Sequence, residues 1–137
     1  RVRDRACRPL QGARVDLWHT DALGRYSGVN APGTFCRGWQ ATDERGEVAF
    51  LTLFPGWYPS RTPHLHLRVE AGGRVFATQL FFPEEGQRQV YALPPYRERG
   101  MPRGNNRQDG LFRADLLLRL EREGEAYRGA FVLTLPG

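Results

Sequence analysis

Alternation of apolar and polar residues is the dominant pattern along the chain, and it predicts β-strands separated by short turns. From 13 to 18 the sequence ARVDLW alternates in this way and ends at the loop DALG. A period of two is typical of a half-buried strand. The runs 64–69 and 75–82 show the same period and are separated by a Gly-Gly turn, which predicts a hairpin between them.

Two further stretches are predicted to form hairpins. Residues 37–42 lead into DERG, whose glycine suits a positive φ, and 47–53 is expected to return as the second strand. Near the C-terminus, alternation runs through 111–120 and again through 127–135, with a turn expected at 122–125. A helix over 114–125 is the competing interpretation, because Leu, Arg and Glu favour helices, but strict alternation favours strands.

The segment 83–108 interrupts this rhythm. It contains four prolines and little periodicity, so we expect a long loop with a helical turn. Loops of this length are usually functional, and Tyr91, Tyr96 and Met101 give this one apolar material to cover a pocket. The whole pattern predicts an all-β fold, an antiparallel β-sandwich of about eight strands with a long Pro-rich loop, as a single domain over 1–137.

Composition agrees with a globular protein and excludes several partners. The 137 residues, 40% hydrophobic and 26% charged, are enough to bury a core. No apolar run approaches the ~20 residues that cross a bilayer, so no membrane partner is expected. The net charge of +5 comes from Arg without any Lys, and the arginines are scattered singly, which argues against nucleic-acid binding. A positive field can still attract an anionic substrate.

The two cysteines, Cys7 and Cys36, are too few for a disulfide scaffold and lack the C-x-x-C spacing of a zinc knuckle. One bridge between them and two free thiols are both compatible with the sequence.

A cluster of chemically versatile residues lies in PGWYPSRTPHLH at 55–66. His64 and His66 would share one face of a strand, roughly 6.6 Å apart at ~3.3 Å per residue, so both imidazoles can converge on one metal ion. Tyr58 in this segment and Tyr26 in GRYSG upstream are further candidate ligands. The sequence therefore predicts a metal site.

The two tyrosines narrow the choice of metal. Zinc sites draw on His, Cys and carboxylates, and copper redox sites on His, Cys and Met. A phenol has an unperturbed pKa near ~10, so only a strongly Lewis-acidic ion holds it deprotonated at neutral pH. Ferric iron is the natural candidate, because two phenolates and one hydroxide balance its three charges.

These motifs resemble the intradiol ring-cleavage dioxygenases, the family of catechol and protocatechuate dioxygenases. VDLWH at 15–19 with GRYS at 24–27 is similar to the family's first tyrosine motif, and PGWY at 55–58 with Arg61 and HLH at 64–66 to its second. TQLFF at 78–82 resembles the strand that follows. The resemblance covers most of the chain, from about Cys7 to the final strand.

The resemblance implies a non-haem Fe(III) centre with Tyr26 and His66 as equatorial ligands and Tyr58 and His64 as the axial pair. Tyr58 would also take up a proton from the substrate. The implied partners are a small aromatic diol and dioxygen. The bond between the two hydroxylated carbons would break to give a muconate-type diacid, and no organic cofactor would be needed.

Other roles follow from the same resemblance. Arg61 resembles the guanidinium that stabilises developing carbanion character on the ring, and Gln79 resembles its partner. The chain lacks a helical N-terminal segment like the one through which catechol dioxygenases dimerise, so the expected oligomeric state stays open between a monomer and an oligomer. His19 is expected to be structural. Residues expected to line the pocket are Trp18, Asp21, Val29, Trp39, Trp57 and parts of 83–108, with Arg97 and Arg99 either meeting a carboxylate or solvated.

Two other interpretations stay open at this point. An Ig-like or transthyretin-like β-sandwich binding module without catalysis would make the H-x-H pair incidental or a site for adventitious zinc, although Tyr26, Tyr58 and Arg61 at these spacings argue against it. A metal-dependent hydrolase would need a carboxylate ligand, and no Asp or Glu lies between Tyr58 and His66.

Overall fold

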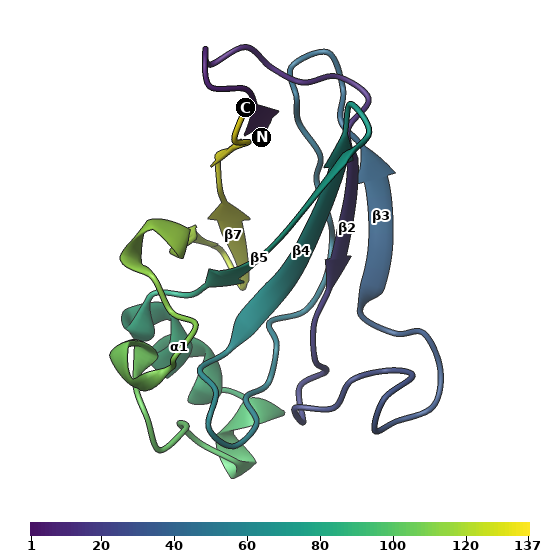
Figure 1. Ribbon diagram of the computed structural model, residues 1–137. Helices are drawn as coiled ribbons and strands as arrows, with labels where there is room; N and C mark the ends of the chain where they lie inside the picture. The colour runs from purple at the N-terminus through teal and green to yellow at the C-terminus, as the bar shows by residue number, and fades with distance from the viewer.

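The computed structural model describes residues 1–137 and shows a fold built mainly from strands (Figure 1). The strands are β1 (Val2–Arg3), β2 (Arg14–Trp18), β3 (Arg37–Ala41), β4 (His64–Ala71), β5 (Arg74–Phe81), β6 (Arg119–Glu123), β7 (Ala126–Ala130) and β8 (Leu133–Thr134). The helical elements are α1 (Glu84–Tyr91) and the 3-10 helices η1 (Tyr96–Glu98), η2 (Asn106–Gln108) and η3 (Ala114–Leu116). No helix has the length and hydrophobicity that a membrane span requires.

The central sheet has the strand order β3-β2-β4-β5, and every neighbouring pair in it is antiparallel. The predicted hairpin of β4 and β5 is confirmed, and it turns through Gly72 and Gly73 at positive φ angles of 55° and 73°. Glycine adopts this left-handed region without the clash that a Cβ would cause. Strand β2, distant in sequence, pairs with β4 and carries β3 at the sheet edge.

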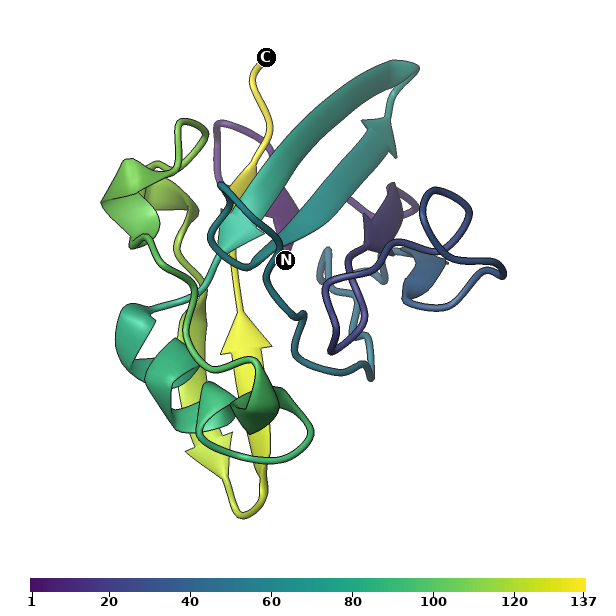
Figure 2. The same ribbon diagram turned by 90° about the horizontal axis from the view of Figure 1, so that it is seen from below.

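A looser second layer faces this sheet and gives the all-β sandwich that the alternation predicts. β1 and β8 pair in parallel, and β6 and β7 form a separate antiparallel hairpin. Figure 2 shows β6, β7 and the helical segment on one side of the molecule and β2 and β3 on the other. The three sheets are not joined into one, so the sandwich is open.

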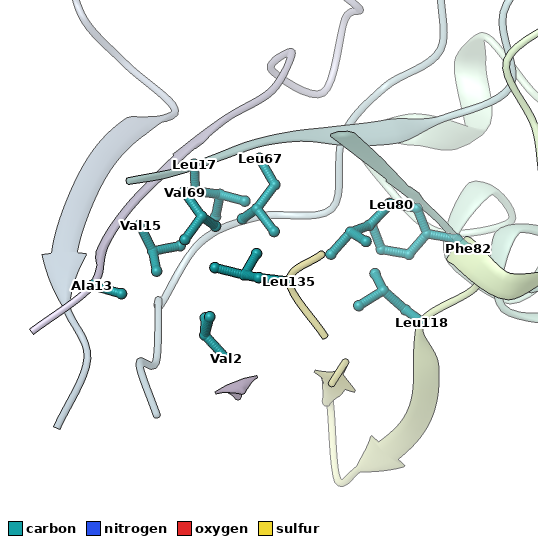
Figure 3. Close-up of a cluster of buried hydrophobic side chains, with 10 residues drawn as sticks. All are labelled: Val2, Ala13, Val15, Leu17, Leu67, Val69, Leu80, Phe82, Leu118 and Leu135. Carbon is teal, nitrogen blue, oxygen red and sulfur yellow. The ribbon is translucent and has the colours of Figure 1, made fainter. Parts of the chain in front are cut away.

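The core lies between these layers (Figure 3). Alternation in β2 and β4 turns their aliphatic side chains toward Val2 and Leu135 of the opposite layer. Burying one such side chain contributes about 1.5–3 kcal/mol. The ten buried members are Val2, Ala13, Val15, Leu17, Leu67, Val69, Leu80, Phe82, Leu118 and Leu135. Because successive residues of a strand point to opposite faces, His64 and His66 project from the outer face.

The predicted strand over 47–53 is wrong. The turn before it forms, with Gly46 at a φ of 72° and its N–H donated to the carbonyl oxygen of Asp43 at 2.9 Å. Beyond the turn, Val48 and Phe50 pack against the core, but the backbone pairs with no strand. Ala49 is instead bonded to the side chain of Gln40. The Gln40 side chain thus takes the Ala49 backbone groups that a partner strand would bond, and Leu51 and Leu53 are exposed.

The C-terminal third departs from the predictions in two places. The stretch 83–108 holds a full helix, α1, and two 3-10 helices, where we expect a loop with one helical turn. The predicted strand over 111–120 is η3 followed by β6 from Arg119, so only its end is a strand, and the alternative helix over 114–125 is limited to η3. The turn near 122–125 is confirmed, because β7 pairs with β6 across Gly124. Cys7 and Cys36 are free thiols.

Candidate metal centre

The sheet register sets the histidine side of the site. His66 lies between Trp18 of β2 and Gln79 of β5, its partners in the two antiparallel ladders. The Trp18 and His66 rings stack, with centroids 5.0 Å apart and planes 6° from parallel. His64 is buried opposite Phe81. Backbone pairing and these ring contacts therefore fix where both imidazoles point.

The tyrosine side comes from two loops that are bonded to each other. Gly56 donates its N–H to the carbonyl oxygen of Asp21 at 2.8 Å and accepts from the Thr20 hydroxyl at 2.6 Å. Gly24 has a φ of 78°, and a Cβ there would clash with the backbone oxygen of Trp57. The two loops approach this closely because glycine lacks a side chain. They carry Tyr26 and Tyr58 to the same place.

The four polar atoms of the predicted ligands converge. Tyr26 Oη lies 3.1 Å from His64 Nε2, 2.9 Å from His66 Nε2 and 3.4 Å from Tyr58 Oη, and Tyr58 Oη lies 3.3 Å from His64 Nε2. Donors held about 2 Å from one transition-metal ion are roughly 2.9–3.4 Å apart. The spacing therefore fits four donors around a single ion.

The orientation of His64 suits a ligand. Its Nδ1 lies 2.8 Å from the carbonyl oxygen of Thr62, an acceptor only, so Nδ1 carries the proton and donates it. The lone pair is then on Nε2, which faces the two tyrosines. A backbone carbonyl that fixes the tautomer in this way is common behind metal-ligating histidines.

Burial sets the protonation states at the cluster. It lowers the pKa of both His64 and His66 to about 4, with the neighbouring Arg61 acting in the same direction. Both imidazoles are therefore neutral near pH 7. Burial and the hydrogen bond with Tyr58 raise the pKa of the Tyr26 phenol. Without a strongly Lewis-acidic ion Tyr26 stays a phenol, so the donor set fits a ferric ion better than a weaker Lewis acid.

Arg61 borders the cluster with its guanidinium bound at three points. Nη1 donates to Tyr58 Oη at 3.3 Å, Nη2 donates to Gln79 Oε1, and Nε donates to Asp109 Oδ2 at 2.8 Å. Burial works against ionisation of Asp109, but hydrogen bonds from the Leu111 N–H, Arg61 and the Thr62 N–H outweigh it and lower its pKa. The site thus holds one fixed cation beside the tyrosine and histidine donors.

The other residues singled out in the sequence are not bonded to the four donors. His19 is buried, and its two ring nitrogens are bonded to the Thr20 carbonyl and the Thr52 hydroxyl, not to the four donors. Trp39 lies under Arg14 and lines a surface hollow together with Trp18, as expected, whereas Val29 is exposed. No group of three or more His, Cys, Asp or Glu side chains comes together, so a carboxylate-containing ligand set does not form.

Two contacts around the site were not predicted. Arg99 stacks over Trp57 with 4.1 Å between its Cζ and the ring, and it donates to the Trp57 carbonyl oxygen at 2.7 Å, so it supports the Tyr58 loop instead of facing solvent. Asp109 reaches Arg61 from 48 residues away in sequence. The Asp-Gly pair at 109–110 indicates only a turn, and no local signal links it to Arg61.

Comparison with known proteins relates the chain to dioxygenases. The sequence model of a protein family described as Dioxygenase matches residues 1–91. The protocatechuate 3,4-dioxygenase beta chain of Burkholderia cepacia is 30% identical over 99 residues, which are 61% of this chain and 42% of that protein. The chain therefore spans well under half the length of this curated relative.

Solved structures match over nearly the whole chain. An intradiol ring-cleavage dioxygenase from Tetranychus urticae superposes with a TM-score of 0.89 at 34% identity, covering 97% of this chain and 76% of that one. The dioxygenase domain of a dioxygenase and carbohydrate-binding protein fusion from Streptomyces sp. SirexAA-E superposes with a TM-score of 0.77 at 34% identity, covering 98% and 75%. The chain belongs to the intradiol ring-cleavage dioxygenase family.

Proposed function

We propose that this chain is a non-haem Fe(III) intradiol dioxygenase whose metal ligands are Tyr26, Tyr58, His64 and His66. The observation that supports the proposal is the convergence of their polar atoms: Tyr26 Oη lies 2.9–3.4 Å from the other three, and Tyr58 Oη lies 3.3 Å from His64 Nε2. The substrate is a catechol-type diol, and dioxygen is the second reactant. Cleavage between the two hydroxylated carbons of catechol incorporates both atoms of dioxygen and yields muconic acid, so every atom of the two reactants is retained in one product.

Ferric iron, when bound, supplies the Lewis acidity and the redox chemistry that couple the diol to dioxygen. The chain supplies the charge balance. Two phenolates offset two of the three positive charges, and neutral His64 and His66 add none. A centre with little net charge can be held in a partly buried site without a large desolvation cost.

Tyr58 is the residue that accepts a proton from the diol. Its Oη accepts from Tyr26 Oη at 3.4 Å and from Arg61 Nη1 at 3.3 Å, and it lies 3.3 Å from His64 Nε2. A phenolate at this position is a base within reach of a substrate held at the same cluster. The Arg61 donor would keep the oxygen in place after it takes the proton.

Arg61 stabilises negative charge that develops on the ring. A guanidinium keeps its positive charge and its planar set of donors, and a fixed cation of this kind lowers the energy of a transition state more than that of the neutral ground state. Gln79 holds one end of it through Nη2. Trp18, stacked on His66, fixes the plane of that imidazole.

The test is a visible spectrum of the protein loaded with Fe(III), recorded before and after catechol, protocatechuate and hydroxyquinol are added in turn without oxygen. We expect a broad tyrosinate-to-iron band that shifts with at least one compound, and a ring-cleaved diacid once oxygen is admitted. A colourless protein, or one that retains only zinc, would contradict the proposal. No contact in the structure favours the alternative of a non-catalytic β-sandwich binding module.

A further inference from the structure

Asp109 is a buried carboxylate that is bonded to Arg61. Its side chain is only 1% exposed, and it lies directly after η2, in a loop far in sequence from the site. Oδ2 accepts from Arg61 Nε at 2.8 Å and from the Thr62 N–H at 3.0 Å, and Oδ1 accepts from the Leu111 N–H at 2.9 Å. These three bonds leave the carboxylate no freedom to turn.

The contact with Asp109 completes the support of the Arg61 guanidinium. Each of its three nitrogens has one acceptor, and the acceptors come from three separate parts of the chain: the Tyr58 loop, strand β5 through Gln79, and the loop of Asp109. Because the guanidinium is planar, three anchored nitrogens define both its position and its plane. Of the three acceptors, only Asp109 is a carboxylate.

The loop that carries Asp109 has anchors of its own. Asn106 donates Nδ2 to the Phe82 carbonyl oxygen at 2.9 Å, and its Oδ1 accepts from Gln87 Nε2 at 2.9 Å and from the Thr62 hydroxyl at 2.5 Å. The Asn106 N–H also donates to Glu84 Oε1 at 2.8 Å. The loop is therefore held against α1 and β5 without the Arg61–Asp109 pair.

We propose that Asp109 is a positioning residue that holds the Arg61 guanidinium against the Tyr26, Tyr58, His64 and His66 cluster. The inference rests on the proposed function, in which Arg61 stabilises charge during ring cleavage. A buried ion pair is weak evidence of net stabilisation, and here the separately anchored loop makes orientation of Arg61 the better explanation of the pair.

The expected kinetic effect follows from orientation. Misplacing a catalytic group by about 1 Å can cost on the order of 100-fold in rate. Asp109→Asn keeps the size of the side chain and removes its charge, so we expect a roughly 30-fold lower kcat with catechol. KM should change by less than about threefold, because Arg61 acts mainly in the transition state.

A double-mutant cycle separates positioning from a general structural role. Asp109→Asn is measured in the native chain and in Arg61→Lys. If Asp109 acts through Arg61, it lowers kcat by less than about twofold in the Arg61→Lys background. An equal loss in both backgrounds, or no loss in the native chain, would overturn the inference. If Asp109→Asn does not fold, Asp109→Glu, which shifts the carboxylate by a methylene, goes through the same cycle with the same two outcomes.

The matched control is Asp115→Asn. Asp115 also pairs with an arginine, accepting two bonds from Arg113 at 3.1 and 2.6 Å, but this pair is exposed and outside the site. Exposed pairs contribute little, so kcat and KM should match those of the native chain. A loss equal to that of Asp109→Asn would overturn the inference.

A measurement without turnover keeps the inference distinct from the proposed function. Hydrogen exchange at Arg61 Nε is followed by NMR in the metal-free protein, with the signal assigned by its absence in Arg61→Lys. We expect exchange at least about tenfold faster in Asp109→Asn than in the native chain. Unchanged exchange would overturn the positioning role. A native chain that cleaves no diol, yet shows the tenfold change, would contradict the proposed function alone.

Discussion

The two halves of the candidate metal centre are held by different kinds of structure. His64, His66 and Gln79 project from β4 and β5, where eight residue pairs fix the register. Tyr26 and Tyr58 lie in loops that no strand ladder holds; scattered contacts hold them instead, such as the Gly56–Asp21 hydrogen bond and the close approach of Gly24 to Trp57. Damage to the core or to the strand register therefore disturbs the histidine half, whereas a change where the two loops meet disturbs the tyrosine half.

The largest loss of stability is expected from a substitution in the strands that carry the histidines. Phe81 is fully buried, lies opposite His64 in the register and packs edge-on against Phe112 with ring centroids 5.3 Å apart. Phe81→Ala should lower the free energy of unfolding by about 3–5 kcal/mol, through lost burial and a cavity. Urea denaturation measures it. Val75→Ala, half-exposed on the same strand, is the control and should cost under about 1 kcal/mol. Similar losses in the two variants would contradict the account.

Adding one methyl group at Gly24 should disturb the two loops that carry the tyrosines. Gly24 and Gly12 have nearly equal φ angles, 78° and 75°, but a Cβ clashes with Trp57 only at Gly24. Gly12→Ala should cost about 1–2 kcal/mol from its left-handed backbone alone. Gly24→Ala should cost about 1–2 kcal/mol more, from the added overlap, and should also lower the iron content of the protein. Equal losses of stability, with iron content unchanged, would show that the contact between the loops is unimportant.

The same contrast explains how much could be predicted from the sequence. Alternation and a Gly-Gly turn are local, so the β4–β5 hairpin and the shared face of His64 and His66 follow from them. For 47–53, alternation shows which side chains are buried but not whether the backbone finds a partner strand. The ring contact of Arg99 with Trp57 and the pairing of Asp109 with Arg61 join residues more than 40 positions apart, and only the folded chain brings them together.

A smaller effect is expected where Arg99 supports the Tyr58 loop. Arg99→Ala removes the contact over the Trp57 ring and the hydrogen bond to its carbonyl oxygen, and should lower the free energy of unfolding by about 1–2 kcal/mol. Thermal unfolding compares it with Arg97→Ala, an exposed neighbour expected to be near neutral. Equal stability of the two variants would rule out this support.

The smallest expected change in stability comes from His19, which belongs to neither half of the site. Burial lowers the pKa of His19 below its ordinary value of 6.5, so below about pH 6.5 the unfolded chain binds the proton more readily and His19 destabilises the fold as the pH falls. Urea denaturation at pH 7.5 and pH 5 should show a stability advantage of the native chain over His19→Gln that narrows at pH 5. An advantage that is constant or grows would contradict the buried neutral state.

The most direct test is the iron content and visible spectrum of the native chain beside one variant from each half, Tyr26→Phe and His66→Gln, with His19→Gln as the control. A single site built by both halves predicts about one Fe(III) per native chain with a tyrosinate band. Tyr26→Phe should lose much of the band and His66→Gln the bound iron, while His19→Gln retains both. If Tyr26→Phe and His66→Gln bind iron with the native spectrum, the two halves do not form a metal centre.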